Sequence, residues 1–210
     1  MPAQPKHRQS IIDTCVTLFR RKGYAGTGLN DIVEVSRAPK GSIYHYFPAG
    51  KPSIAVAAIE EAGQRVVATL MQLATENASA ADMVVAHAEL LAKWMKKSGF
   101  RDGCPITTVL LELAPADRAV TEAGRQAYAA RIDIIADKLI ADGHLGDRAQ
   151  RLAVLTVSAV QGALIQARIE RSEAPILTSA QELKTFLDFE VNRQAQKLSI
   201  HPVHACHDNE

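Results

Sequence analysis

The side chains whose types could do chemistry gather in one short stretch, "SRAPKGSIYHYFPAGK", residues 36–51. Aromatic residues make up only 5% of the chain, yet Tyr44, Tyr46 and Phe47 fall here beside His45. Hydroxyl and imidazole groups can hydrogen-bond phosphates or pack against the methyl group of a thymine. The stretch therefore predicts contact with nucleic acid. The alternative is a short helix with aromatic ends that only fills a core.

The charge of the chain is uneven. Residues 1–51 hold eight Lys or Arg and three Asp or Glu, a net charge of +5, whereas the whole chain has a net charge of +1. A basic N-terminal part on a mildly acidic body favours a polyanionic partner for that part alone. Blocks of like charge are also common on solvated faces, so the charge by itself does not establish a polyanionic partner.

Three helices are expected to position these side chains. Apolar residues recur at helical spacing in residues 5–22, and Gly23 is a natural end for that helix. Thr27 is suited to cap a second helix, and Pro39 to begin a third. Two short helices joined by a tight turn form a helix-turn-helix, whose second helix enters the major groove of DNA.

The third helix is expected to have two different sides. Ile43 and Phe47 lie together on a helical wheel and should anchor the helix in the core. The residues expected on the outer sides are Lys40, Gly41, Ser42, Tyr44 and His45. Lys51, in the first turn of the next helix, is expected to meet a phosphate together with free backbone amides.

Glycines in this region raise the alternative of a phosphate-binding enzyme. "GTG" at residues 26–28 follows no predicted strand and lacks the third glycine of a dinucleotide-binding loop. "AGKPS" fails as a P-loop, because His45 stands where the first glycine belongs and Pro52 follows the lysine. No carboxylate pair, nucleophile with a base or metal-ligand set supports catalysis. The sequence therefore predicts no enzymatic activity, no cofactor and no metal.

The segment "GYAGTGLNDIVEVSRAPKGSIYHYFPAGK", residues 23–51, resembles the DNA-binding signature of the tetracycline-repressor (TetR) family. With "GCP" at residues 103–105, the chain is most similar to the subgroup of lincomycin-resistance-type repressors. The resemblance implies a ligand-responsive regulator, most simply a repressor, that binds a palindromic operator in double-stranded DNA. The DNA-binding residues that it implies are Thr27, Arg37, Lys40, Gly41, Ser42, Tyr44, His45, Tyr46 and Lys51.

Arg37 departs from the family pattern, because the turn between the two helices usually has Gly at this position. If the backbone there needs a positive φ, the arginine is mildly strained. The substitution also places one more cation beside the DNA backbone.

The rest of the chain also predicts helices, so the expected fold class is all-α. An N-terminal three-helix bundle with the helix-turn-helix, residues 1–50, precedes a helical ligand-binding and dimerisation domain, residues 51–198. The predicted helices of this domain span 51–76, a segment capped by Asp82, 105–113, 116–142, 147–173 and 178–198. Residues 199–210 are predicted to be a flexible tail. Three His and one Cys in the tail are a weak metal signal, and a disordered terminus is favoured.

The last two predicted helices favour a homodimer. The helix 147–173 is rich in small residues, including Gly162, and a glycine in mid-helix is typical of close helix packing. The last helix is apolar on more than one side, so it must be covered on both. The resemblance implies a four-helix bundle between two copies of the chain. The alternative is that both helices lie in the core of a monomer.

A small-molecule effector is implied by the resemblance, bound inside the helical body. The predicted lining combines adaptable apolar surface with a few polar groups: Met83, His87, Trp94, Phe100, Cys104, Thr108, Tyr128 and Gln161. Taken one by one, His87 and Trp94 fit ordinary core positions better than a ligand site. Cys104 fits a buried thiol better than a redox sensor, because only Arg101 is basic beside it.

The expected location is the cytoplasm. The three cysteines are odd in number and far apart, as in reduced proteins, and the polar N-terminus shows no signal-peptide core. No apolar run approaches the ~20 residues of a membrane span. The main alternative function is a helical small-molecule carrier, or an enzyme body, with an accessory basic head.

Overall fold

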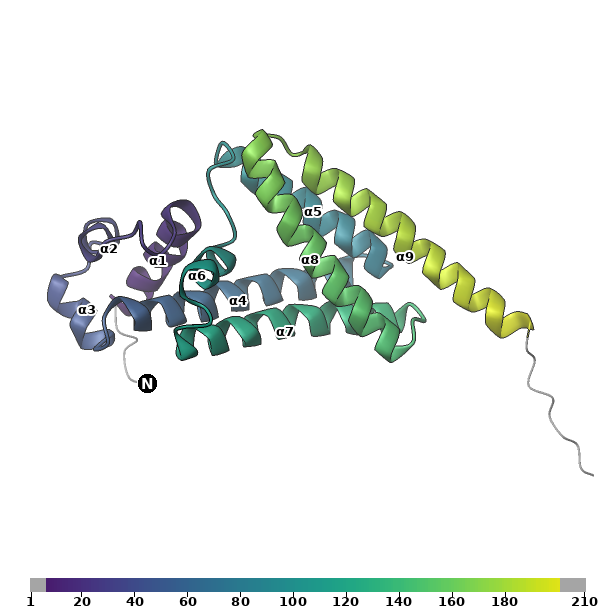
Figure 1. The fold of residues 1–210 in the computed structure, drawn as a ribbon, viewed down its shortest axis with the longest axis horizontal. Helices are drawn as coiled ribbons and strands as arrows, with labels where there is room; N and C mark the ends of the chain where they lie inside the picture. The colour runs from purple at the N-terminus through teal and green to yellow at the C-terminus, as the bar shows by residue number, and fades with distance from the viewer. Residues whose placement is uncertain (1–6, 201–210) are drawn as a thin grey trace, which may run out of the picture.

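A computed structural model describes residues 7–200 of the chain, and nine α-helices lie in this range. Their bounds are α1 Arg8–Lys22, α2 Leu29–Ser36, α3 Lys40–Tyr46, α4 Lys51–Glu76, α5 Ala80–Lys97, α6 Pro105–Leu113, α7 Arg118–Ala141, α8 Gly146–Glu170 and α9 Ala174–Ile200. The all-α prediction is confirmed. Figure 1 shows α1, α2 and α3 gathered at one end of the molecule, with the longer helices beyond them.

We call the three N-terminal helices the head. Residues at their ends are suited to capping a helix. Gly23 has a φ of 76° and ends α1, and its N–H donates to the carbonyl of Phe19. Gly28, rather than the predicted Thr27, caps α2, and its N–H donates to the Asp31 carboxylate over 3.0 Å. The prediction of Thr27 as the cap is wrong because its side chain points into the core, as described below.

The remaining six helices form the body. α4 leaves the head and packs along α7, while α5 packs along α9, and α8 crosses between the two pairs. The body thus has two layers of long helices (Figure 1). By length and composition alone α8 could cross a membrane, with a mean hydropathy of 1.5, but it packs against α7 and α9. Long packing helices of water-soluble folds pass the same test.

Several predicted helix limits shift by a few residues. α5 is capped by Ser79, whose hydroxyl oxygen accepts from the N–H of Asp82, so Asp82 lies inside the helix. α9 begins at Ala174, earlier than the predicted 178, because Pro175 is tolerated in the first helical turn. The first two residues of the predicted tail belong to α9. The His and Cys residues of the tail lie outside the described residues.

One apolar core joins the head to the body. Ile11, Phe19 and Ile43 of the head belong to the same buried cluster as Ile106 of α6 and Val120 of α7. The head is therefore held by α6 and the start of α7 as well as by α4, which packs against α1 and supplies residues such as Ile54 to the same cluster. The cluster has residues on both sides of the predicted boundary between residues 50 and 51.

Candidate functional site

The third helix presents a polar face because two apolar residues fix its other side. Ile43 and Phe47 are 1% and 3% exposed, as the sequence predicted. Tyr44 is 51% exposed and His45 is also exposed, together with Lys40 and Gly41; Ser42 is half-buried. An added Cβ at Gly41 would meet no atom within 4 Å, so this side of α3 is open. The helix can thus approach a large partner closely.

The turn before this helix is rigid. Arg37 ends α2 in the left-handed conformation, with φ 55° and ψ 22°, so this position does need a positive φ. The preceding Ser36 is buried; its hydroxyl oxygen accepts from the N–H of Ala38, and its carbonyl accepts from the hydroxyl of Ser10. Arg37 is exposed, and it lies three residues before the start of α3.

A shallow hollow of about 360 Å³ lies between the start of α2 and α3. Its lining residues are Gly28, Leu29, Asn30, Asp31, Lys40 and Tyr44. Sequence reasoning missed Asn30, whose exposed amide can both donate and accept hydrogen bonds. The available signal was its position in the first turn of α2, the helix before the predicted recognition helix α3.

Three of the predicted DNA-binding residues have side chains that pack against other parts of the protein. Thr27 is 0% exposed and its hydroxyl donates to the carbonyl of Gly23, so its side chain does not reach the surface. Tyr46 is half-buried against the core cluster. The ammonium of Lys51 lies 4.1 Å from the ring centroid of Tyr24, and partial burial lowers the pKa of this lysine. A phosphate would have to draw Lys51 away from that ring.

Polar contacts tie α6 and the loop before it to the head. The Glu112 carboxylate accepts the N–H groups of Tyr24 and Ala25, at 2.7 and 2.6 Å. In the loop, the N–H of Gly103 donates to the carbonyl of Arg20 over 2.8 Å. These bonds hold the backbone that leads from α1 to α2, so a displacement of α6 would move the head.

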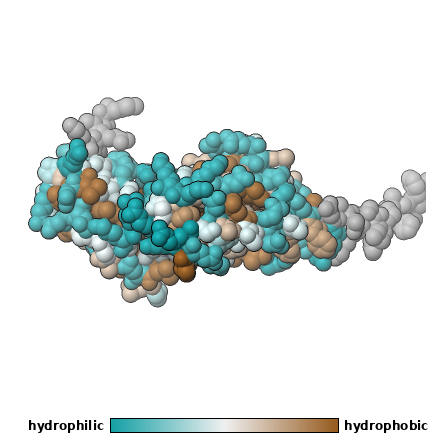
Figure 2. Space-filling model, turned by 90° about the horizontal axis from the view of Figure 1, so that it is seen from above, coloured by the Kyte–Doolittle hydropathy of each residue, from teal (hydrophilic) through white to brown (hydrophobic). Residues whose placement is uncertain are grey.

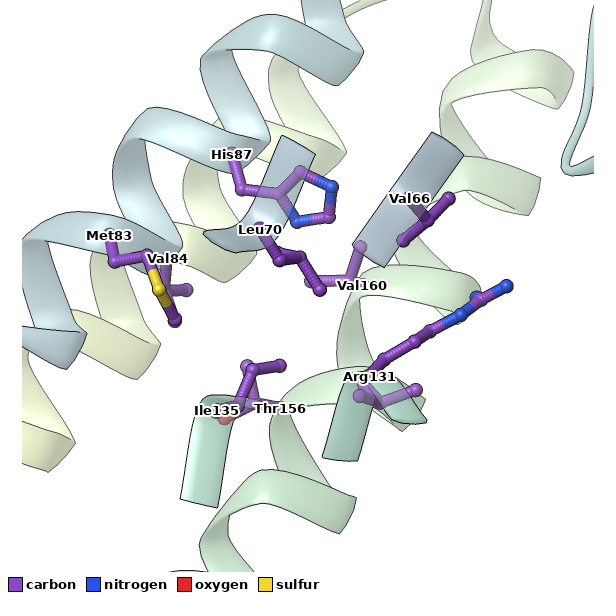
Figure 3. Close-up of a pocket in the computed structure, with 10 residues that line it drawn as sticks. Val66, Leu70, Met83, Val84, His87, Arg131, Ile135, Thr156 and Val160 are labelled. Carbon is purple, nitrogen blue, oxygen red and sulfur yellow. The ribbon is translucent and has the colours of Figure 1, made fainter. Parts of the chain in front are cut away.

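A small cavity of about 30 Å³ lies in the body. Its lining residues are Val66, Leu70, Met83, Val84, His87, Arg131, Ile135, Thr156, Val157 and Val160. Of the predicted lining residues, Met83 and His87 are present. Figure 3 shows the side chains of Leu70, Met83, His87 and Ile135 facing a common space, with Arg131 extending along its edge on the side of Val66.

The other predicted lining residues lie elsewhere. Trp94 is 47% exposed on α5, and Phe100 and Cys104 pack near the end of α5 and the start of α6. The hydroxyl of Thr108 donates to the carbonyl of Phe19, so this residue faces the head. Trp94 and Thr108 are therefore not among the residues that line this cavity, because helical periodicity fixes a face but not the element that packs against it.

A polar cluster of Thr107, Tyr128 and Gln161 lies close to the cavity. The hydroxyls of Thr107 and Tyr128 are 2.7 Å apart, and Thr107 donates to the amide oxygen of Gln161 over 2.9 Å. The ring of Tyr128 stacks against Arg131, whose guanidinium carbon lies 4.5 Å from the ring centroid. Tyr128 and Gln161 are thus linked through Thr107, whereas the sequence had predicted its neighbour Thr108 as a lining residue.

Arg131 and His87 set the electrostatics of the cavity. Arg131 is only 4% exposed, which is rare for an arginine. Burial, together with the nearby Arg131 cation, lowers the pKa of His87 to about 4, so the imidazole is neutral near pH 7. Sequence reasoning missed Arg131, although it sits four residues from Ala127 and from Ile135, on the buried stripe of α7. A charge on an apolar stripe was the signal.

Comparison with known proteins agrees with this geometry. Residues 11–58 match the family of bacterial regulatory proteins of the tetR type, and residues 80–182 match the C-terminal domain of LmrA/YxaF-like transcriptional regulators. An uncharacterised helix-turn-helix transcriptional regulator of Mycobacterium tuberculosis is 31% identical, over 86% of this chain and 93% of that protein. The regulator LmrA of Bacillus subtilis is 27% identical, over 81% of this chain and 90% of its own length.

Solved structures share the fold. The regulatory protein TetR from Rhodobacter sphaeroides superposes with a TM-score of 0.75 at 23% identity, over 85% of this chain and 97% of that one. The reduced form of Escherichia coli NemR gives a TM-score of 0.72 at 23% identity, over 85% and 95%. The chain therefore belongs to the TetR family of helix-turn-helix transcriptional regulators, with a C-terminal domain of the LmrA/YxaF-like type.

Proposed function

We propose that the protein is a repressor that binds a palindromic operator as a homodimer and is released by a small molecule held in the body. The observation on which this depends is the exposed polar face of α3, anchored from behind by Ile43 and Phe47. Lys40, Tyr44 and His45 offer a cation, a hydroxyl and an imidazole to phosphates and base edges. Residues 1–50 would bind DNA and residues 51–198 would bind the effector and the second copy, in the cytoplasm.

The dimer would form through α8 and α9. Large apolar side chains on these two helices are exposed: Val154, Leu155, Ile165, Ile169, Leu177, Phe186 and Phe189. An added Cβ at Gly162 would meet no atom of the described residues within 4 Å, so among them no helix uses the close approach that this glycine permits. Apolar residues also appear at the surface of the body in Figure 2. Such a face is typical of a helical interface between two copies.

Release of DNA would depend on a movement of α6. Thr107 bonds to Tyr128 and Gln161 in the body, whereas its neighbour Thr108 bonds to the carbonyl of Phe19 in the head. An effector that shifts α6 would therefore change the position of α1 relative to the body. Coupling of this kind is typically worth about 1–3 kcal/mol, and the effector must bind the released conformation better.

Operator binding tests the DNA-binding part of the proposal. We would titrate the protein into fluorescent DNA from upstream of its own gene, and into a scrambled duplex, at several salt concentrations. We expect specific binding whose affinity falls steeply with salt, because bound cations are released from the phosphates.

Two lysine variants sharpen the assay. Lys40→Ala should weaken operator binding and reduce the salt slope by about 1. Lys97→Ala removes the same charge from an exposed site at the end of α5 and serves as the matched control. Equal affinity for scrambled DNA, or equal effects of the two variants, would contradict the assignment of α3 as the recognition helix and would favour a helical ligand carrier.

A further inference from the structure

Arg131 is a buried cation that has no counter-ion among the described residues. Its Nε donates to the carbonyl of Ala127 over 3.2 Å, and its guanidinium stacks on the ring of Tyr128. Its Nη2 is buried with no hydrogen-bond partner, and among residues 7–200 no carboxylate oxygen lies within 4.0 Å of it. A buried charge is costly unless it is paired, so a cation retained in this position is expected to have a partner.

The surroundings leave room for one negative charge. Among the described residues that line the cavity, Arg131 is the one cation at neutral pH, because His87 is held neutral. The hydroxyl of Thr156 is engaged with the carbonyl of Leu152, and most of the other lining side chains are aliphatic. The site thus combines a single fixed positive charge with an apolar wall.

We propose that Arg131 binds the carboxylate of the effector, which is an organic monocarboxylate with an apolar body lying between α4, α5, α7 and α8. The planar guanidinium matches a carboxylate in a bidentate pair, and one cation balances one negative charge. A phosphate dianion would leave net negative charge among the aliphatic side chains. This inference rests on the proposed function only for its consequence, the release of DNA.

The cavity must open for such a ligand. It measures about 30 Å³, enough for a water molecule, whereas small-molecule pockets measure about 300–1,000 Å³. Met83 can yield space because its side chain is unbranched and flexible. Arg131 lies on α7 next to Tyr128, which is bonded to Thr107 of α6. A ligand that draws the guanidinium away from the ring would therefore disturb the contact between α7 and α6.

A series of straight-chain carboxylates from acetate to octanoate, each compared with its primary amide, tests the proposal. The amide has the same shape without the charge. At fixed pH and ionic strength, we expect carboxylates of the series to raise the Tm of the full-length protein more than their amides do. Isothermal titration of the best carboxylate gives its Kd.

Three variants separate a ligand-binding arginine from a structural one. Arg131→Met should weaken carboxylate binding by about tenfold to a hundredfold, and Arg131→Lys should retain part of the affinity. Arg125→Met removes an exposed arginine from the same helix and is the matched control. Without ligand, Arg131→Met should have a Tm at least equal to that of the original protein, because it removes an unpaired buried charge.

Three results would each overturn the proposal. The first is that no carboxylate stabilises the original protein more than its amide. The second is that Arg131→Met binds carboxylates normally. The third is that Arg131→Met has a lower Tm without ligand while Arg131→Lys shows no preference for carboxylates. Operator binding is measured separately. Carboxylate binding without release of DNA would contradict the proposed function alone.

Discussion

Acidification should destabilise the protein through His87. Its pKa is about 4 in the folded chain, below its ordinary value of 6.5, because of burial and the nearby Arg131. The unfolded chain therefore binds a proton that the folded chain does not. The contribution of His87 to stability is fully present at pH values above its ordinary pKa of 6.5. It is lost as the pH falls from 6.5 toward the folded pKa of about 4. Between about pH 7 and about pH 5 the expected loss is about 2 kcal/mol for this group.

Urea denaturation of the original protein and of His87→Leu at both pH values measures this loss. Other groups also titrate, including His144, whose pKa is lowered by burial, so the original protein alone is not diagnostic. The difference in unfolding free energy between the two proteins isolates His87, and it should change by about 2 kcal/mol on acidification in favour of the leucine variant. An unchanged difference would refute the idea that His87 is held neutral by its surroundings.

The other predictions concern the core, the dimer and the contact of head with body. Ile43→Ala should lower the free energy of unfolding by about 2–4 kcal/mol in urea denaturation, since the side chain is 1% exposed. Gly162→Leu should convert dimers to monomers in sedimentation velocity, while the helical circular-dichroism signal stays unchanged. Glu112→Ala leaves two backbone N–H groups without their acceptor, so it should lower stability by about 1–3 kcal/mol and speed hydrogen exchange in the loop between α1 and α2.

Local sequence patterns were enough to predict the head. Ile43 and Phe47 are buried because their spacing puts them on one side of a two-turn helix, and this spacing is visible in the sequence. The same holds for Gly23, since a glycine after a periodic apolar run is a strong helix-end signal. Thr27 was misplaced because a cap and a buried hydroxyl bonded to a backbone carbonyl look alike in sequence.

The lining of the cavity could not be predicted in the same way. Periodicity places Trp94 on a face of α5, but it does not tell whether another helix covers that face. Thr107 and Thr108 differ by one position and by about 100° around α6, so one bonds to the body and the other to the head. Such distinctions depend on long-range packing, which a single sequence does not reveal.

The two hydrogen bonds that Glu112 accepts from the loop after α1 bear on the design of chimaeric regulators. A graft that joins this head to a foreign body at residue 50 would cut the shared core and remove the acceptor of the Tyr24 and Ala25 amides. The transferable unit is therefore the head together with its own α4 and α6, although α5 separates these two helices in sequence. A chimaera that keeps the native α4 and α6 with the head should retain both operator affinity and stability, whereas one spliced by sequence order alone should lose them.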